Sequence, residues 1–130
     1  MAHILVIEDE PDFRQFVMAI LKHQRHQATQ TASLREGLAL ARRDRPDLIL
    51  LDLTLPDGSG LDFLDQPEVQ GLNVIAMTAV LNLELEEGLQ ARAVTFFVKP
   101  ITGHGLIDLV NHCLTGGRHG HTDGNPDRGR

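Results

Sequence analysis

Apolar runs alternate with helical patterns along most of the chain. The run HILVIED at residues 3–9 suits a strand that is buried on both faces. Further strands are predicted at LILLDL (48–53), NVIAMTA (73–79) and TFFVKP (95–100), with a weaker, polar candidate at 26–31. Between these runs, apolar residues recur every three or four positions, which is the spacing of an amphipathic helix.

The best-marked helix is segment 33–46. It opens with Ser33 and Glu36 at the spacing of a capping box and ends at Pro46. Other helices are predicted at 11–24, 60–71, 83–92 and 104–114, and the turn-rich segment from Pro56 to Gly60 is predicted to be a loop. Pro67 should interrupt the second of these early, because proline cannot continue a helix. Since strands and helices alternate, the predicted fold class is α/β, a parallel sheet with right-handed crossovers and helices on both faces.

In the segment LNLELEEGL, residues 81–89, helical and strand periodicities conflict. Leu81, Leu85 and Leu89 fall on one helical face, whereas Leu83 points elsewhere and should face water. Gly88 costs about 1 kcal/mol relative to alanine in a helix. We therefore expect the helix here to be the least stable of those near the carboxyl edge of the sheet.

Length and composition allow one compact domain in a reduced compartment. The chain has 130 residues, of which 42% are hydrophobic, and its single cysteine, Cys113, cannot form an intramolecular disulfide. A net charge of −6 argues against nucleic acid as a direct partner. No stretch has the length of a membrane helix, so a cytoplasmic protein without membrane insertion is expected. We assign the domain to 1–114 and expect the Gly/His-rich segment 115–130 to be a disordered tail or the start of a linker.

Polar residues collect where the predicted strands end. Glu8 and Asp9 follow the first strand, Asp52 ends the third, Thr78 the fourth, and Lys99 the fifth. The carboxyl ends of parallel strands share one edge, which is where ligands bind in such sheets. Asp52 therefore need not be a buried charge, because it should emerge at this edge among possible compensating partners. Three carboxylates in one place repel each other unless a cation lies between them, and Mg²⁺ suits oxygen ligands. Together with a lysine and a hydroxyl, they are the parts needed for phosphoryl transfer to a carboxylate. The plainer alternative is that Glu8 and Asp9 only cap the following helix.

These motifs together resemble the receiver domain of two-component response regulators. They are VIEDE in the first strand, DLTLPDGSG after the third, MTA at the fourth and FFVKP at the fifth. The resemblance extends over residues 3–114. It implies a doubly wound, flavodoxin-like (βα)5 fold whose five-stranded parallel sheet has the strand order 2-1-3-4-5.

The resemblance also implies a phosphoacceptor and a metal site. Asp52 would be phosphorylated by a histidine kinase or a phosphotransfer protein. Mg²⁺ would be held by Asp9, Asp52 and the backbone carbonyl of Thr54, with Glu8 acting mostly through water. Such a domain is a signalling phosphoacceptor whose own activity is limited to autophosphorylation and autodephosphorylation.

Four further residues receive roles from the resemblance. Thr78 and Lys99 would contact the phosphoryl group, Thr78 and Phe96 would form the switch pair, and Pro100 would follow a cis peptide bond. The position of Phe96 is often tyrosine in the family. Phosphorylation would then alter a surface made by the fourth helix, fifth strand and fifth helix, which binds a downstream protein or a second copy.

The sequence also allows three other interpretations. A phosphatase of the haloacid dehalogenase type needs a second carboxylate two residues after its aspartate, and Thr54 stands there. A dinucleotide-binding loop needs a third glycine after Gly58 and Gly60, and Phe63 stands there. The remaining alternative is a degenerate receiver that acts only as a protein-interaction module.

Overall fold

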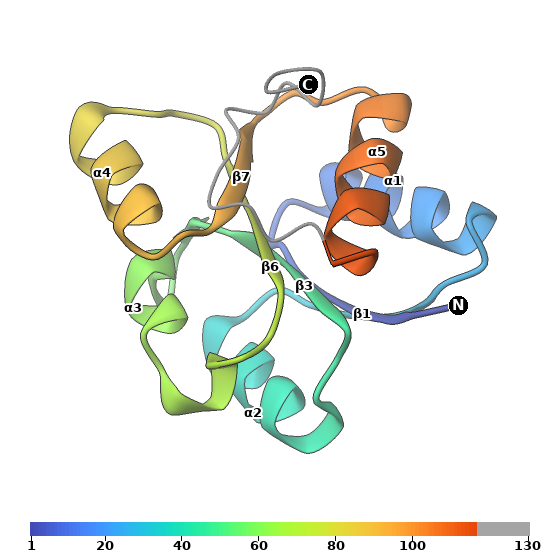
Figure 1. Cartoon of the computed structure of the whole chain (residues 1–130), viewed down its shortest axis with the longest axis horizontal. Coiled ribbons are helices and arrows are strands. Elements are labelled where there is room, and N and C mark those ends of the chain that lie inside the picture. Colours follow the sequence, from blue (N-terminus) through green and yellow to red (C-terminus); the bar gives the residue numbers. More distant parts are fainter. Residues whose placement is uncertain (117–130) are drawn as a thin grey trace.

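A five-stranded parallel sheet lies at the centre of the computed structural model, which describes residues 1–116 (Figure 1). Its order is β2-β1-β3-β6-β7. The strands are β1 (His3–Ile7), β2 (Gln27–Thr31), β3 (Leu48–Asp52), β6 (Val74–Thr78) and β7 (Thr95–Val98). A separate antiparallel hairpin joins β4 (Thr54–Leu55) to β5 (Gly58–Ser59). Without the hairpin the order is 2-1-3-4-5, so the predicted fold class and topology are confirmed.

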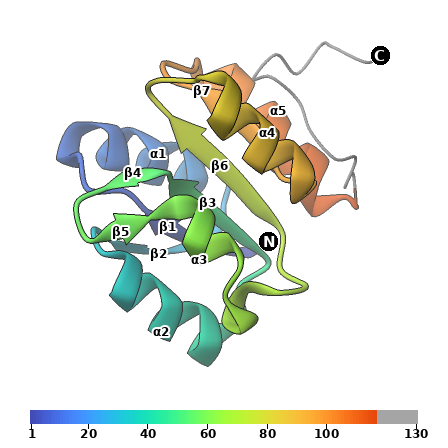
Figure 2. The same cartoon turned by 90° about the vertical axis from the view of Figure 1, so that its left-hand side faces the viewer.

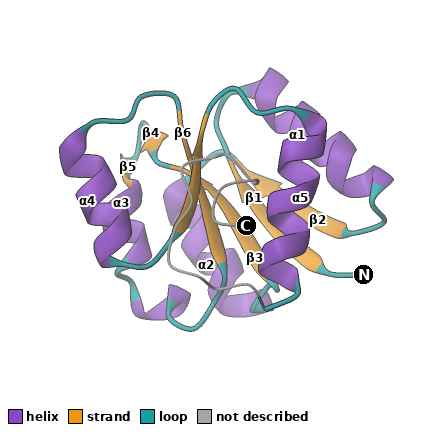
Figure 3. Cartoon of the chain, turned by 45° about the horizontal axis from the view of Figure 1, so that its top comes forward, coloured by secondary structure: helices purple, strands orange, loops and turns teal. Residues whose placement is uncertain are grey.

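Helices cover both faces of this sheet (Figures 1 and 3). They are α1 (Pro11–His23), α2 (Leu34–Asp44), α3 (Gly60–Leu64), α4 (Leu83–Ala91) and α5 (Gly103–Leu114), with a 3-10 turn η1 (Pro67–Val69). α1 and α5 pack on one face, whereas α2, α3 and α4 pack on the other.

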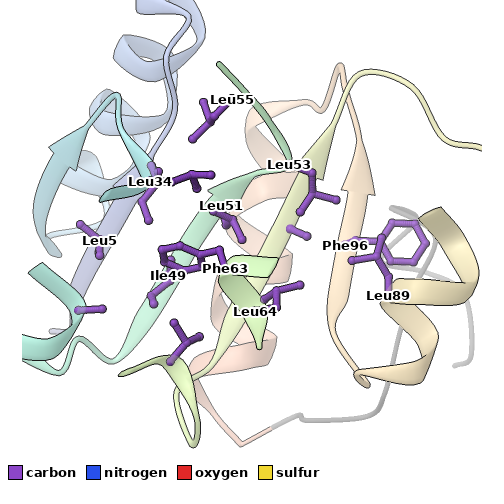
Figure 4. Close-up of a cluster of buried hydrophobic side chains, with 14 residues drawn as sticks. Leu5, Leu34, Ile49, Leu51, Leu53, Leu55, Phe63, Leu64, Leu89 and Phe96 are labelled. Carbon is purple, nitrogen blue, oxygen red and sulfur yellow. The ribbon is translucent and has the colours of Figure 1, made fainter. Parts of the chain in front are cut away.

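Two hydrophobic clusters fill the space between sheet and helices. Alternate residues of β1 point to opposite sides, so that Ile4 and Val6 belong to one cluster while Leu5 and Ile7 belong to the other. Figure 4 shows the second cluster, in which Leu5 lies with side chains of α2, α3 and α4. All five residues of β3 are buried, as expected for the central strand of a sheet covered on both faces.

The largest local departure from expectation is the hairpin after β3. The segment from Pro56 to Gly60 was expected to be a loop, but β4 and β5 form an antiparallel ladder there. It has two residue pairs, Thr54 with Ser59 and Leu55 with Gly58. The ladder is too short to produce a period-two pattern in the sequence. The chain then enters α3, which is short as predicted, because Pro67 begins a 3-10 turn instead of continuing the helix.

Two further expectations concern β2 and the start of α2. The weak strand candidate at 26–31 is a full parallel strand, β2, paired with β1 over five residues. Ser33 caps α2 by accepting a hydrogen bond from the Glu36 backbone N–H. The carboxylate of Glu36 instead accepts from the Thr31 hydroxyl, so the capping box is only half formed.

The conflict in segment 81–89 is resolved as predicted. Leu89 is buried, and Leu81 and Leu85 pack against the core as partly buried residues. Leu83, at the start of α4, is 69% exposed. The segment is therefore a helix with a narrow apolar face.

The predicted tail, 115–130, lies almost wholly outside the described residues, of which Gly116 is the last. The expectation of a disordered tail or linker therefore stays a prediction. Within residues 1–116, no helix combines the length and apolar character needed to cross a membrane.

Candidate functional site

The carboxyl edge of the sheet brings the predicted polar residues together. β1, β3, β6 and β7 are neighbours in the sheet and parallel, so their carboxyl ends lie along one edge. Glu8 and Asp9 directly follow β1, Asp52 ends β3, Thr78 ends β6, and Lys99 directly follows β7.

Three carboxylates form the centre of the site. Glu8, Asp9 and Asp52 each offer an oxygen, and these oxygens all lie within 4.8 Å of one another. Glu8 and Asp52 are buried, and Asp9 is more exposed. Carboxylate oxygens at such spacing are the ligand type that a hard divalent cation such as Mg²⁺ prefers. The donor set therefore fits a magnesium ion.

Neither Glu8 nor Asp9 is the N-cap of α1. That position belongs to Glu10, whose carboxylate accepts a hydrogen bond from the Phe13 backbone N–H, and Pro11 supplies the first helical residue. Glu8 itself accepts from the Glu10 backbone N–H at 3.0 Å. The capping alternative is thus wrong for this pair, and the carboxylate of Asp9 is left beside those of Glu8 and Asp52.

Lys99 supplies positive charge inside this cluster. Its Nζ lies 2.8 Å from Oε1 of Glu8 and 3.4 Å from Oδ2 of Asp52. We expected Asp52 to emerge at the sheet edge, but it is only 3% exposed. The lysine explains why this is tolerated, since a buried charge requires a partner. The Lys99–Pro100 peptide bond is cis.

Burial and ion pairing shift the pKa values of Glu8 and Lys99. Burial raises the pKa of Glu8 above its ordinary value, and the hydrogen bonds from Lys99 and the Glu10 N–H oppose this rise only in part. Burial alone would lower the pKa of Lys99, but the hydrogen bond to Glu8 and the charge of Asp52 outweigh it and raise that pKa. The ammonium group is therefore held in its charged form beside the carboxylates.

The sequence did not reveal the role of Phe13 at this site. Phe13 packs against the core from α1, and its ring also lies under the ammonium of Lys99, with 4.6 Å between the ring centroid and Nζ. An ammonium over an aromatic face is an attractive contact. The only available signal was that Phe13 follows the acidic residues within one helical turn.

The backbone after β3 directly contacts Asp52. The Thr54 N–H donates to Oδ1 of Asp52 at 2.8 Å, and Thr54 is the first residue of the hairpin (Figure 2). At the far end of the hairpin turn, the carboxylate of Asp57 accepts hydrogen bonds from the start of α2. Sequence reasoning missed Asp57, because its partners lie more than twenty residues away and no local motif links them.

Thr78 and Phe96 lie on neighbouring strands, β6 and β7. Thr78 is buried, its hydroxyl donates to the Val80 carbonyl at 2.8 Å, and the Val80 N–H donates back to that oxygen at 3.3 Å. Phe96 is fully buried, with Leu89 of α4 close to its ring (Figure 4). The hydroxyl at the site edge and the aromatic ring beneath α4 thus belong to adjacent strands.

This arrangement supports chemistry on a phosphoryl group. A carboxylate oxygen can act as the nucleophile, and nearby positive charge can offset charge on the phosphoryl oxygens. All of the polar side chains predicted from the strand ends lie at one edge of the sheet, and Phe96 is buried in β7, three residues before Lys99.

Comparison with known proteins points in the same direction. The sequence profile of the response regulator receiver domain matches residues 4–111. Sporulation initiation phosphotransferase F of Bacillus subtilis (strain 168) is 30% identical over 114 residues, covering 85% of this chain and 92% of that protein. The chain also spans 56% and 44% of two other curated relatives, both described as transcriptional regulatory proteins.

Solved structures agree with the fold. Chemotaxis protein CheY4 of Vibrio cholerae matches with a TM-score of 0.79 and 26% identity, over 88% of this chain and 99% of that one. The receiver domain of a sensor histidine kinase from Pseudomonas aeruginosa PAO1, solved with a magnesium ion in its active site cleft, matches with a TM-score of 0.78. This second match covers 88% of this chain and 98% of that one, and at 23% identity it supports the fold alone.

Proposed function

Because this chain belongs to the response regulator receiver domain family, which serves phosphorylation-based signalling, we propose that Asp52 is its phosphoacceptor. The donor is a histidine kinase or a histidine phosphotransfer protein. An oxygen of Asp52 forms the new bond to phosphorus, while the bond from phosphorus to the donor histidine nitrogen breaks. The products are an aspartyl phosphate on this chain and a free histidine on the donor.

The observation that carries the proposal is the environment of Asp52. Its carboxylate ends the central strand, beside two other carboxylates and 3.4 Å from the ammonium of Lys99. One oxygen accepts the Thr54 N–H, which orients the carboxylate. The degenerate alternative, a module that only binds partners, has no use for this set of paired charges.

Mg²⁺ is the proposed cofactor. Glu8, Asp9, Asp52 and the backbone carbonyl of Thr54 would hold it, with Glu8 contributing mostly through water. When bound, the ion offsets negative charge on the phosphoryl oxygens. Lys99 contributes a second positive charge, and Thr78 offers its hydroxyl to a phosphoryl oxygen.

The proposed output is a surface formed by α4, β7 and α5. Thr78 precedes α4 in the chain, and its hydroxyl would leave the Val80 carbonyl to reach the phosphoryl group. Val80 and Leu83 are 70% and 69% exposed between Thr78 and the first turn of α4. Together with Phe96 as the second switch residue, this segment would change the surface offered to a downstream protein or to a second copy.

The deciding experiment is incubation with acetyl phosphate and Mg²⁺, followed by intact mass measurement. Wild-type protein should gain one phosphate, and Asp52→Asn should gain none while keeping its fold. Omitting Mg²⁺ should suppress the gain. If Asp52→Asn labels as well as the wild type, the assignment of the phosphoacceptor is wrong. If the wild type does not label, the interaction module becomes the better reading.

A further inference from the structure

Asp57 ties the loop that follows Asp52 to the start of α2. Its two carboxylate oxygens accept three hydrogen bonds, from the Ser33 hydroxyl at 3.1 Å, the Leu34 N–H at 3.0 Å and the Arg35 N–H at 3.2 Å. The first amides of a helix have no partner within the helix, and a negative charge there is favourable. The carboxylate of Asp57 therefore supplies acceptors to amides that the helix itself leaves without a partner.

The hairpin that carries Asp57 needs such an anchor. β4 and β5 form only two residue pairs, and a two-stranded ladder of that length is not stable by itself. At its beginning the hairpin is fixed to the sheet, because the Leu53 N–H donates to the Met77 carbonyl at 2.9 Å. Leu55 is buried in the hydrophobic cluster that α2, α3 and α4 form with the sheet. Asp57 lies in the turn between β4 and β5 and ties that turn to the start of α2.

The same hairpin carries the backbone groups of Thr54. Its N–H donates to Asp52, and its carbonyl is a ligand in the proposed magnesium site. A displacement of about 1 Å at a reacting centre can cost roughly a hundredfold in rate. The position of the Thr54 backbone therefore affects both the orientation of Asp52 and the binding of the metal.

We infer that Asp57 is a positioning residue, which holds the β4–β5 hairpin against α2 and so keeps the Thr54 backbone in place for Asp52 and the metal. The inference rests on the proposed function. Asp57 does not touch the phosphoryl group, and it acts through the hairpin alone. The competing explanation is that Asp57 merely stabilises α2.

The test compares three variants with the wild type. Asp57→Ala removes all three hydrogen bonds, and Asp57→Asn is a milder change that keeps one oxygen acceptor. Ser33→Ala removes the N-cap of α2, whose hydroxyl accepts from the Glu36 N–H, but leaves both amide hydrogen bonds to Asp57. Ser33→Ala also removes the hydroxyl donor to Asp57, so it weakens α2 while the hairpin keeps two of its three hydrogen bonds to the helix.

The first readout is the Mg²⁺ concentration at half-saturation, from a titration followed by the backbone amide signals in NMR. The second is the rate of labelling by acetyl phosphate at saturating Mg²⁺. Loss of an outer-shell partner costs roughly 10–100-fold in metal affinity or activity. Asp57→Ala should raise the half-saturation concentration toward that range, Asp57→Asn less, and Ser33→Ala should lower the melting temperature with near wild-type half-saturation.

The outcomes separate the two proposals. If the wild type labels but Asp57→Ala keeps the wild-type half-saturation and rate, the positioning role is wrong and the proposed function stands. Equal effects of Ser33→Ala and Asp57→Ala on the half-saturation concentration would also overturn the positioning role, because Ser33→Ala keeps both amide hydrogen bonds to Asp57. If the wild type binds Mg²⁺ but does not label, the proposed function fails, and the titration still decides the role of Asp57.

Discussion

α4 and α5 flank the same edge strand, β7, but they are held in very different ways. Both begin with a side-chain cap, Asn82 accepting from the Leu85 N–H at 2.8 Å and Thr102 from the Gly105 N–H at 2.9 Å. α5 then buries four side chains against the sheet, which are Leu106, Leu109, Val110 and Cys113. α4 buries one, Leu89.

The difference shows that burial, and not capping, separates these helices. Most helical stability in proteins comes from packing of an apolar face, so α5 is part of the core and α4 is a loosely held element. α4 is also the helix that follows Thr78 in the chain. Under the proposed function, the helix that follows Thr78 is therefore the less tightly packed of the two.

The largest test of this comparison removes one packed leucine. Leu109 is 2% exposed, and Leu109→Ala in α5 should lower the free energy of unfolding by about 2–5 kcal/mol, because it leaves a cavity. Leu83→Ser in α4 is the control and should change it by no more than about 0.5 kcal/mol, as expected for an exposed position. Urea denaturation measures both. A large loss from Leu83→Ser would show that α4 is ordinary core.

The second test concerns motion. Amide hydrogen exchange in residues 81–92 should be about tenfold or more faster than in residues 106–114, since lightly packed segments open more readily. Phosphorylation should slow exchange in the first segment and leave the second unchanged. Thr78→Ala should still accept phosphate but lose this slowing, and slowing that persists in Thr78→Ala would break the proposed coupling.

A third test strengthens α4. A side chain at Gly88 would gain about 1 kcal/mol of helix propensity, but its Cβ would lie 2.9 Å from Cδ1 of Leu61 in α3. Because that methyl group ends a flexible side chain, Gly88→Ala should raise the free energy of unfolding by less than about 1 kcal/mol and slow exchange in α4. Thermal melting and exchange measure this, and a net destabilisation would mean that Leu61 cannot shift.

The smallest effect is expected at the ion pair between α3 and the end of α4. Two nitrogens of Arg92 each lie 2.8 Å from an oxygen of Asp65, and Arg92 also donates to the Gly88 carbonyl. Arg92→Gln should speed exchange in α4 a few-fold at most, because exposed ion pairs contribute little. Exchange in α5 is the internal control. Equal acceleration in both helices would indicate a global loss of stability instead.

Much of the fold was predictable because its signals are local. Apolar runs marked β1, β3, β6 and β7, and Pro67 marked the end of α3. The polar residues of the site were predictable too, because parallel strands bring their carboxyl ends to one edge. The hairpin at 54–59 was not, since two ladder pairs leave no periodic pattern.

Contacts between distant segments were the other limit. The ring of Phe13 under Lys99 and the carboxylate of Asp57 on α2 depend on the assembled tertiary structure. The burial of Asp52 was misjudged for the same reason, because only the placement of Lys99 makes it tolerable.

The ion pair of Glu8 and Lys99 joins residues 91 positions apart, near opposite ends of the domain. The two residues follow β1 and β7, which are separated in the sheet by β3 and β6, so the pair requires all four of these strands to be in place. A nascent chain still lacking β7 cannot hold the site. Any ligand that needs both residues therefore selects fully folded chains, and its binding stabilises the domain as a whole.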